Sequence, residues 1–304
     1  MSTSCESIEM AFPSTLSEAL ALQADERTRG RLISGGTDLM AQWESGVLAP
    51  PPRAISLQSL SELRGIHEFD ASLQMEPGRP RPGSLPSISI GALTTHAELR
   101  SSPLIQQHLP ALAAAAATVG GAQIQARGTL AGNVANASPA GDLIPSLLIA
   151  NASVIVASMT GERQIPLANF YLGYRKIDLH PDEIIVRFVL KKCPEGSRES
   201  FRKLGPRAAQ AISKIMCAYR ARVQDGLVQC FHLALGSVAP TPIRLYDFET
   251  WIEGQTLSTA LLDEAERKVA SLVSPVADIR STAEYRQWVA GRLVRGFLEE
   301  LLGG

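Results

Sequence analysis

The segment Thr129–Asp142, which reads TLAGNVANASPAGD, decides the fold of this chain. It consists mainly of small residues with two asparagines and one carboxylate, and the apolar run Leu143–Ala152 follows it directly. A core segment would carry larger side chains, and a linker would not separate two apolar runs. Small residues let a backbone come close to a ligand, with its N–H groups facing that ligand. We therefore interpret the segment as a loop against a bound molecule.

The segment Leu32–Leu39, which reads LISGGTDL, has the same character. We predict a short strand over 31–34, a turn at Gly35-Gly36, and a helix that begins near Leu39. A helix start after a glycine turn presents free N–H groups to an anion. Each segment alone also fits a packed turn without a ligand, with Asp142 as a plain helix cap. Two such segments in one domain favour a cofactor that carries phosphates.

The composition excludes several classes of function. The chain has 304 residues and a formal net charge of −1, which allows two domains or one large domain with an appendage. No basic cluster marks a nucleic-acid binder, and no apolar run is long enough to span a bilayer. The N-terminus lacks a basic start and an apolar signal core, so we expect a cytoplasmic protein. The chain contains no HExxH, P-loop or GxGxxG motif.

The cysteines and histidines predict no metal site. The four cysteines are far apart and form no CxxC pair, so we expect free thiols at Cys5, Cys193, Cys217 and Cys230. Three histidines lack a second metal ligand at useful spacing and are expected to be solvated or structural, namely His67, His96 and His108.

The rest of the chain predicts alternating helices and strands. Helices are expected at 14–22, 60–63, 95–99, 110–118, from 257 onward and at 282–302. Strands are expected at 55–57, 88–92, 153–157, 163–165, 183–190, 213–223 and 227–235, with a surface loop at 77–86 and a hairpin turn at Asp225-Gly226. The polar connector 193–199 is the predicted boundary between domains 1–192 and 198–304, and the C-terminal third is predicted to be a small α+β domain.

These motifs, in this order, resemble the FAD-binding (medium) subunit of the molybdenum hydroxylases, most of all the bacterial xanthine dehydrogenase type. The resemblance covers essentially the whole chain. Its motifs are ISGGTDL at 33–39, RGTLAGN at 127–133, ASPAGD at 137–142, FYLGYRK at 170–176, FRKLGPR at 201–207, AISK at 211–214 and LGSVAPTP at 235–242. It implies an α+β protein, with an FAD-binding domain of the PCMH/vanillyl-alcohol-oxidase type built from two α/β subdomains that hold FAD between them. A small α+β domain like the CO dehydrogenase flavoprotein C-terminal domain would follow.

The resemblance also implies roles for individual residues. The FAD pyrophosphate would bind to Leu32, Ile33, Ser34, Gly35, Gly36, Thr37, Asp38, Leu39, Thr129, Leu130, Ala131, Gly132 and Asn133. The remaining contacts would be Asp142 on the ribityl or ribose hydroxyls, Ile185 as an apolar flavin contact, Lys203 as a basic one, and Val119 where some relatives have a stacking aromatic. Ala131 replaces a family glycine, which requires a negative φ at this position. Tyr174 and Arg175 would line the acceptor side of the flavin, and no acid–base catalytic residue and no metal ligand is assigned.

The function that the resemblance implies is electron transfer. Electrons would come from a molybdenum-cofactor large subunit through [2Fe–2S] clusters on a small subunit, and would leave from FAD on this chain to NAD⁺ or another acceptor. The molybdenum cofactor and the clusters are expected only on those partner subunits. Two alternatives remain open: a stand-alone FAD-dependent oxidase of the same fold, and a flavin-free scaffold or assembly relative.

Overall fold

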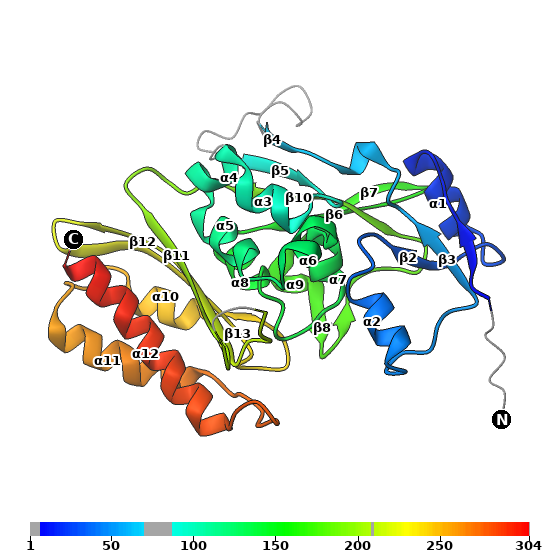
Figure 1. The fold of residues 1–304 in the computed structure, drawn as a ribbon. Coiled ribbons are helices and arrows are strands. Elements are labelled where there is room, and N and C mark those ends of the chain that lie inside the picture. Colours follow the sequence, from blue (N-terminus) through cyan, green and yellow to red (C-terminus); the bar gives the residue numbers. More distant parts are fainter. Residues whose placement is uncertain (1–6, 70–86, 208–209, 304) are drawn as a thin grey trace.

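The computed structural model describes residues 7–69, 87–207 and 210–303. Cys5 and the predicted loop at 77–86 lie outside these ranges. Across Figure 1, from right to left, the layers are a small N-terminal sheet, a central sheet, a group of helices, a second large sheet and a final layer of helices. The molecule has mixed helices and strands, which confirms the predicted α+β class.

The N-terminal sheet is parallel and has the order β1-β3-β2. Its elements are β1 (Glu9–Ala11), α1 (Leu16–Ala24), β2 (Arg31–Ile33), α2 (Leu39–Glu44), β3 (Arg53–Ser56) and the 3₁₀ turn η1 (Ser61–Leu63). The predicted N-cap of α1 is confirmed, because Thr15 Oγ1 accepts a hydrogen bond from the Glu18 N–H at 3.2 Å. The Glu18 carboxylate accepts from the Ser14 N–H and the Ser14 hydroxyl, and the helix begins and ends two residues later than expected.

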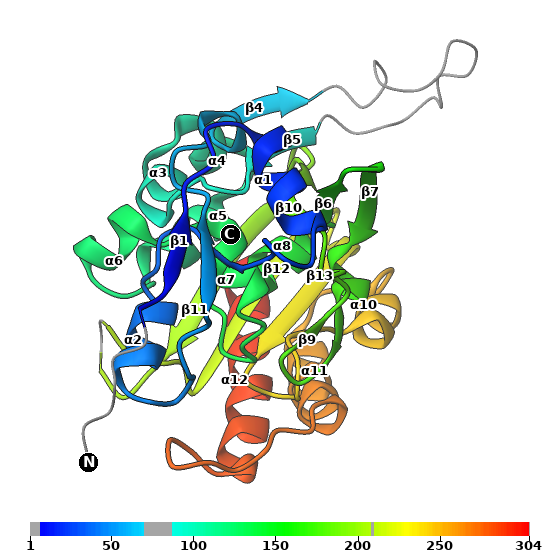
Figure 2. The same ribbon diagram turned by 90° about the vertical axis from the view of Figure 1, so that its right-hand side faces the viewer.

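The central sheet is antiparallel and has the order β4-β5-β10-β6-β7. Its strands are β4 (Ile66–Phe69), β5 (Ser87–Gly91), β6 (Ser153–Ser158), β7 (Gly161–Pro166) and β10 (Ile184–Lys191). Successive side chains of β6 alternate between two cores: Val154 and Val156 pack toward the helices, whereas Ile155 and Ala157 pack toward α1. Figure 2 shows α1 and the N-terminal sheet on the near side of the central sheet.

The helices of the second subdomain cover the other face of the central sheet. They are α3 (His96–Ser101), α4 (Pro103–His108), α5 (Pro110–Ala117), α6 (Ala122–Arg127), α7 (Leu130–Ala135), α8 (Ile144–Ile149) and α9 (Leu167–Phe170), with the hairpin β8 (Tyr171–Gly173) and β9 (Lys176–Ile177). The interpretation of Thr129–Asp142 as a loop throughout is wrong, because its first half forms α7. The Thr129 hydroxyl caps this helix. The cap was not predicted, because the run of small residues that follows it is also typical of a loop.

The C-terminal domain is an antiparallel sheet in the order β11-β12-β13-β14, with three helices on its outer face (Figure 1). Its elements are β11 (Arg198–Leu204), β12 (Ile215–Gln224), β13 (Leu227–Gly236), β14 (Ile243–Arg244), α10 (Tyr246–Ile252), α11 (Thr259–Leu272) and α12 (Ala283–Leu302). The predicted turn is confirmed, since Asp225 and Gly226 both have positive φ, at 52° and 75°. The predicted domain limits, 1–192 and 198–304, stay a prediction.

A buried ion pair connects the C-terminal sheet to the helices of the second subdomain. Arg220 on β12 donates from Nε to Glu199 on β11 at 2.6 Å, and both side chains are 1 % exposed. The other Glu199 oxygen accepts from the Ala111 N–H in the first turn of α5, at 3.3 Å. The Arg220 guanidinium also donates to the carbonyls of Lys191 and Lys192, at the end of β10 and just beyond it. This network fixes α5 against β11 and β12, and it thereby also fixes the helices that border the candidate functional site.

Candidate functional site: a cavity between the two N-terminal subdomains

A cavity of about 740 Å³ lies between the N-terminal sheet and the second subdomain. Its lining comes from the turn 34–38, from Leu32 on β2 and Arg53 on β3, and from α6 and α7. The loop from Asp178 to Glu183 borders it as well. Of the residues expected to bind FAD, thirteen line this cavity: Leu32, Ser34, Gly35, Gly36, Thr37, Asp38, Leu39, Val119, Thr129, Ala131, Gly132, Asn133 and Ile185.

The turn from Gly35 to Asp38 leaves its backbone N–H groups free. Within the described residues, none of these four amides donates a hydrogen bond to a protein acceptor. Gly36 has a φ of +71°, a conformation that glycine adopts without the strain imposed by a side chain. Successive free amides around such a turn form a concave site for anions. The turn can therefore hold a phosphate without a basic side chain.

Gly35 packs directly against the turn between α6 and α7. A Cβ added at Gly35 would lie 2.7 Å from the carbonyl carbon of Arg127 and 3.0 Å from the Cα of Gly128. The Ser34 and Thr129 hydroxyls also bond to each other at 2.9 Å across the cavity wall. The two segments that the sequence singled out are thus in contact, and each fixes the position of the other.

The amides at the start of α7 are used within the protein. The N–H groups of Leu130 and Ala131 donate to the carbonyls of Thr94 and Ala92, at 2.9 and 3.0 Å, and the Gly132 N–H donates to Thr129 Oγ1. The free amides that we expected in this segment are therefore on the turn 34–38 instead. Ala131 belongs to the helix and is absent from the residues of positive φ, so its methyl group is accommodated as required.

One polar atom of α7 has no protein partner. The Asn133 Oδ1 atom is buried without a hydrogen bond, and its residue lines the cavity. A buried carbonyl oxygen without a partner is costly, which indicates that a ligand or an ordered water bonds to it. Together with the free amides of the turn, this gives the cavity both donors and an acceptor.

Asp142 and Lys203 lie outside the lining of the large cavity. Lys203 Nζ donates to Asp142 Oδ2 at 2.6 Å and to the Thr118 carbonyl at 3.0 Å, and the Ser213 hydroxyl donates to Asp142 Oδ1 at 2.6 Å. Burial raises the pKa of Asp142, while Lys203 and Ser213 act in the opposite direction. Lys203 instead lines a second cavity of about 400 Å³, whose lining includes Thr118, the residue that precedes Val119 of the first cavity.

The remaining predicted residues lie behind or away from the cavity. Ile33 and Leu130 are 9 % and 0 % exposed and pack beneath its walls. Tyr174 and Arg175 form the tip of the β8–β9 hairpin, line neither cavity, and contact each other with the guanidinium 5.8 Å from the ring centre. Arg175 has a φ of +54°, which no motif in the sequence indicated.

Sequence reasoning missed several residues at the cavity. His96, expected to be solvated or structural, is 3 % exposed and lines it, and burial lowers the pKa of its imidazole to about 4. His180 and Glu183 line the cavity from the loop before β10. Little in the sequence indicated that His180 and Glu183 line the cavity, because they belong to a loop of ordinary turn residues whose position depends on tertiary contacts.

Within residues 7–69, 87–207 and 210–303, no group of three or more histidine, cysteine or acidic side chains gathers in a way that could bind a metal ion. No helix in those ranges has the length and apolar character needed to cross a membrane.

Comparison with known proteins identifies the family to which this fold belongs. Residues 6–78 and 84–190 match the FAD binding domain in molybdopterin dehydrogenase, and residues 200–301 match the CO dehydrogenase flavoprotein C-terminal domain. The chain thus belongs to the FAD-binding medium subunits of the molybdenum hydroxylase family. It is the flavoprotein subunit of an oxidoreductase of the xanthine and CO dehydrogenase type, with FAD as its cofactor.

Individual relatives cover nearly the whole chain. The xanthine dehydrogenase FAD-binding subunit of Escherichia coli O157:H7 is 31 % identical over 94 % of this chain and 93 % of its own. The carbon monoxide dehydrogenase medium chain of Hydrogenophaga pseudoflava is 29 % identical over 94 % of each chain. A solved structure of carbon monoxide dehydrogenase from the same organism superimposes with a TM-score of 0.85, at 27 % identity over 95 % of each chain. These matches confirm the predicted FAD-binding domain and C-terminal domain.

Proposed function

We propose that this chain is the electron-transfer subunit of a cytoplasmic, xanthine-dehydrogenase-like molybdenum hydroxylase. It would receive electrons from [2Fe–2S] clusters on a small subunit, which are reduced by a molybdenum-cofactor large subunit, and deliver them to NAD⁺ or another acceptor. Relatives named as medium chains and FAD-binding subunits support this assignment. The observation that carries it is that Gly35 to Asp38, whose amides have no protein acceptor among the described residues, line a cavity of about 740 Å³.

The cavity fits FAD in its chemistry. The amides of the turn 34–38 would bind the pyrophosphate, and the buried Asn133 Oδ1 would accept a hydrogen bond from a hydroxyl or amine of the cofactor. Val119 and Ile185 are apolar and line the same cavity, as a flavin ring requires. Bound FAD supplies the redox chemistry, and the protein holds it in place and shields it from water.

Lys203 and Asp142 would act at the flavin end. Lys203 lines the second cavity and donates to the carbonyl of Thr118, the residue before Val119, and its ammonium group would be the basic contact to the flavin. Asp142 holds Lys203 in this position and would use its remaining lone pairs for the ribityl hydroxyls. Tyr174 and Arg175, at the exposed hairpin tip, would approach the flavin only on its acceptor side, after partner or acceptor binding.

Reconstitution with FAD tests the proposal. The purified chain should take up one equivalent of FAD with flavin absorbance bands, and should co-purify with a molybdenum-cofactor chain and a small iron–sulfur chain when all three are co-expressed. Absence of flavin bands after reconstitution would favour the scaffold alternative. Turnover of an organic substrate by the chain alone would favour the stand-alone oxidase.

The acceptor has a separate test. NADH added anaerobically to the FAD-loaded chain should bleach the flavin absorbance if NAD⁺ is the physiological acceptor, because hydride transfer is reversible. A chain that dithionite reduces and NADH does not would require a different acceptor.

A further inference from the structure

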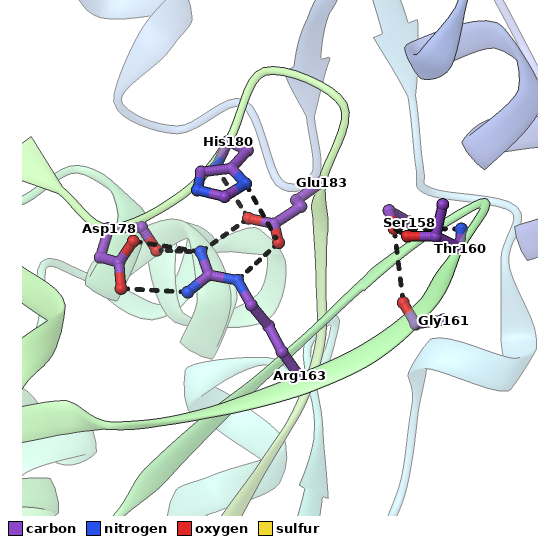
Figure 3. Close-up of polar contacts among 7 residues, drawn as sticks. All are labelled: Ser158, Thr160, Gly161, Arg163, Asp178, His180 and Glu183. Atoms are coloured by element: carbon purple, nitrogen blue, oxygen red, sulfur yellow. Dashed lines mark hydrogen bonds and ion pairs between the residues drawn. The ribbon is translucent and has the colours of Figure 1, made fainter.

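The loop between β9 and β10, residues 178–183, is held by one arginine on strand β7 (Figure 3). Arg163 donates to Glu183 through Nε and Nη2, at 2.6 and 2.9 Å. It donates to the Asp178 carboxylate through Nη1 and Nη2, at 3.0 and 3.1 Å, and to the Asp178 carbonyl at 3.1 Å. One guanidinium therefore ties together the first and last residues of the loop.

This clamp is built from charged hydrogen bonds that are partly shielded from water. Glu183 is 6 % exposed at its side chain, and Arg163 and Asp178 are about one-third exposed, at 34 % and 33 %. Burial would raise the pKa of Glu183, but hydrogen bonds from Arg163 and from the His180 N–H outweigh it and lower that pKa. Paired hydrogen bonds from a planar guanidinium also fix the geometry, which an ammonium group cannot do.

A second contact ties the same loop to the N-terminal subdomain. Gln23 in α1 donates from Nε2 to the Pro181 carbonyl at 2.7 Å, and Gln23 is 7 % exposed. The loop is thus fixed from two sides, by β7 of the central sheet and by α1. Because the loop contacts both subdomains and lines the cavity between them, a displacement of the loop would change the shape of the cavity.

The clamped loop borders the large cavity. Leu179, His180, Pro181 and Glu183 belong to its lining, together with Gln23 of α1. Val119, between α5 and α6, also lines the cavity, and the carbonyl of the preceding residue, Thr118, accepts a hydrogen bond from Lys203. The free amides of the turn 34–38 provide the anion site of the cavity. With the flavin half of a bound dinucleotide toward Val119 and Lys203, the adenosine half would occupy the rest of the lining, to which the clamped loop belongs.

We propose that Arg163 is a positioning residue that sets the affinity for the adenosine half of FAD by fixing the loop 178–183. This inference rests on the proposed function, which places the flavin half toward Val119 and Lys203. Arg163 does not line the cavity, so its effect passes through the loop. Its loss should weaken the binding of any ligand that carries adenosine diphosphate, and should leave the flavin environment unchanged.

The experiment compares Arg163→Met with Arg187→Met in the full chain. Arg187 donates two hydrogen bonds to the Glu162 carboxylate, both at 2.6 Å, and neither residue lines either of the two cavities. Arg187→Met therefore removes a similar interaction from the same sheet. Binding of ADP and of FAD to the flavin-free chain is measured by calorimetry, together with the absorbance spectrum and midpoint potential of bound FAD. We expect Arg163→Met to raise the Kd of ADP and of FAD by the same factor, about tenfold, which corresponds to the loss of one or two hydrogen-bonded supports.

The flavin spectrum and potential should match those of the unchanged chain in both variants, and Arg187→Met should leave both Kd values unchanged. Arg163→Lys should recover only part of the affinity, because lysine lacks the planar fork. If Arg163→Met fails to fold, Gln23→Leu removes the other support of the loop and should raise the same two Kd values severalfold.

Three results would overturn the inference: equal affinities for Arg163→Met and the unchanged chain, a loss of FAD affinity without a matching loss for ADP, or a shifted flavin potential. Failure of the unchanged chain to bind FAD would instead refute the proposed function, so the two failures are distinguishable.

Discussion

Replacing Gly35 with alanine should separate the two segments that form the cavity wall. The added Cβ would meet backbone atoms of Arg127 and Gly128, which cannot rotate away as a side chain can. Since Cβ atoms essentially never approach other atoms within 3.0 Å, the turn and the α6–α7 segment must move apart by about 1 Å. Such overpacking costs about 1–3 kcal/mol of folding free energy.

The effect of Gly35→Ala on FAD should exceed its effect on stability. Hydrogen bonds to charged groups contribute about 1.5–3 kcal/mol each. Misaligning two of the amides in the turn 34–38 should therefore cost about 3 kcal/mol or more of binding free energy, which is a rise in Kd of roughly a hundredfold or more. The assay is FAD titration of the flavin-free chain, followed by quenching of flavin fluorescence.

Gly46→Ala is the matched control. Gly46 has the same φ as Gly36, +71°, and an added Cβ would meet nothing within 4 Å. This variant should lose about 1 kcal/mol of stability from backbone strain and keep its FAD affinity. A Gly35→Ala chain that binds FAD as tightly as Gly46→Ala would refute the placement of the pyrophosphate on this turn.

Three further predictions concern single side chains. Thr129→Ala should cost about 1 kcal/mol of unfolding free energy as a lost helix cap, and should weaken FAD binding because the bond to Ser34 is lost as well; chemical denaturation and FAD titration measure the two effects. Arg220→Met should cost about 3–5 kcal/mol, because Glu199 stays buried without its partner, and a denaturation midpoint close to that of the unchanged chain would contradict this. Burial lowers the pKa of His96 to about 4, so the unfolded chain binds a proton below about pH 6.5 that the folded chain does not. Stability should therefore fall between about pH 6.5 and pH 4, by on the order of 3 kcal/mol from this residue, and denaturation curves of His96→Gln should show a correspondingly smaller fall.

The sequence predicted the outline of the fold because its strongest signals are local. The Asp225-Gly226 turn has two positive φ angles and appears where expected, and the long periodic segment 282–302 forms α12. Thr129–Asp142 was misjudged because its small residues suit a helix start as well as a loop. The decisive difference is tertiary: the carbonyls of Ala92 and Thr94 accept its amides.

The part of the candidate site that depends on glycine residues could be predicted from the sequence. The part that depends on contacts between residues distant in sequence could not. Gly35 and Gly36 indicated the anion turn directly. The position of the loop 178–183 depends on Arg163 and Gln23, which are far apart in the sequence and belong to no recognisable motif. Ala131 requires a negative φ, and this condition is met because Ala131 lies in α7, the helix that Thr129 caps.

A crystal structure of the FAD-loaded chain tests the assignment of the cavity most directly. The pyrophosphate oxygens should accept hydrogen bonds from the N–H groups of Gly35 to Asp38, with the flavin ring toward Val119 and the adenosine toward the loop 178–183. A pyrophosphate bound elsewhere, or an FAD molecule in the opposite direction, would contradict it.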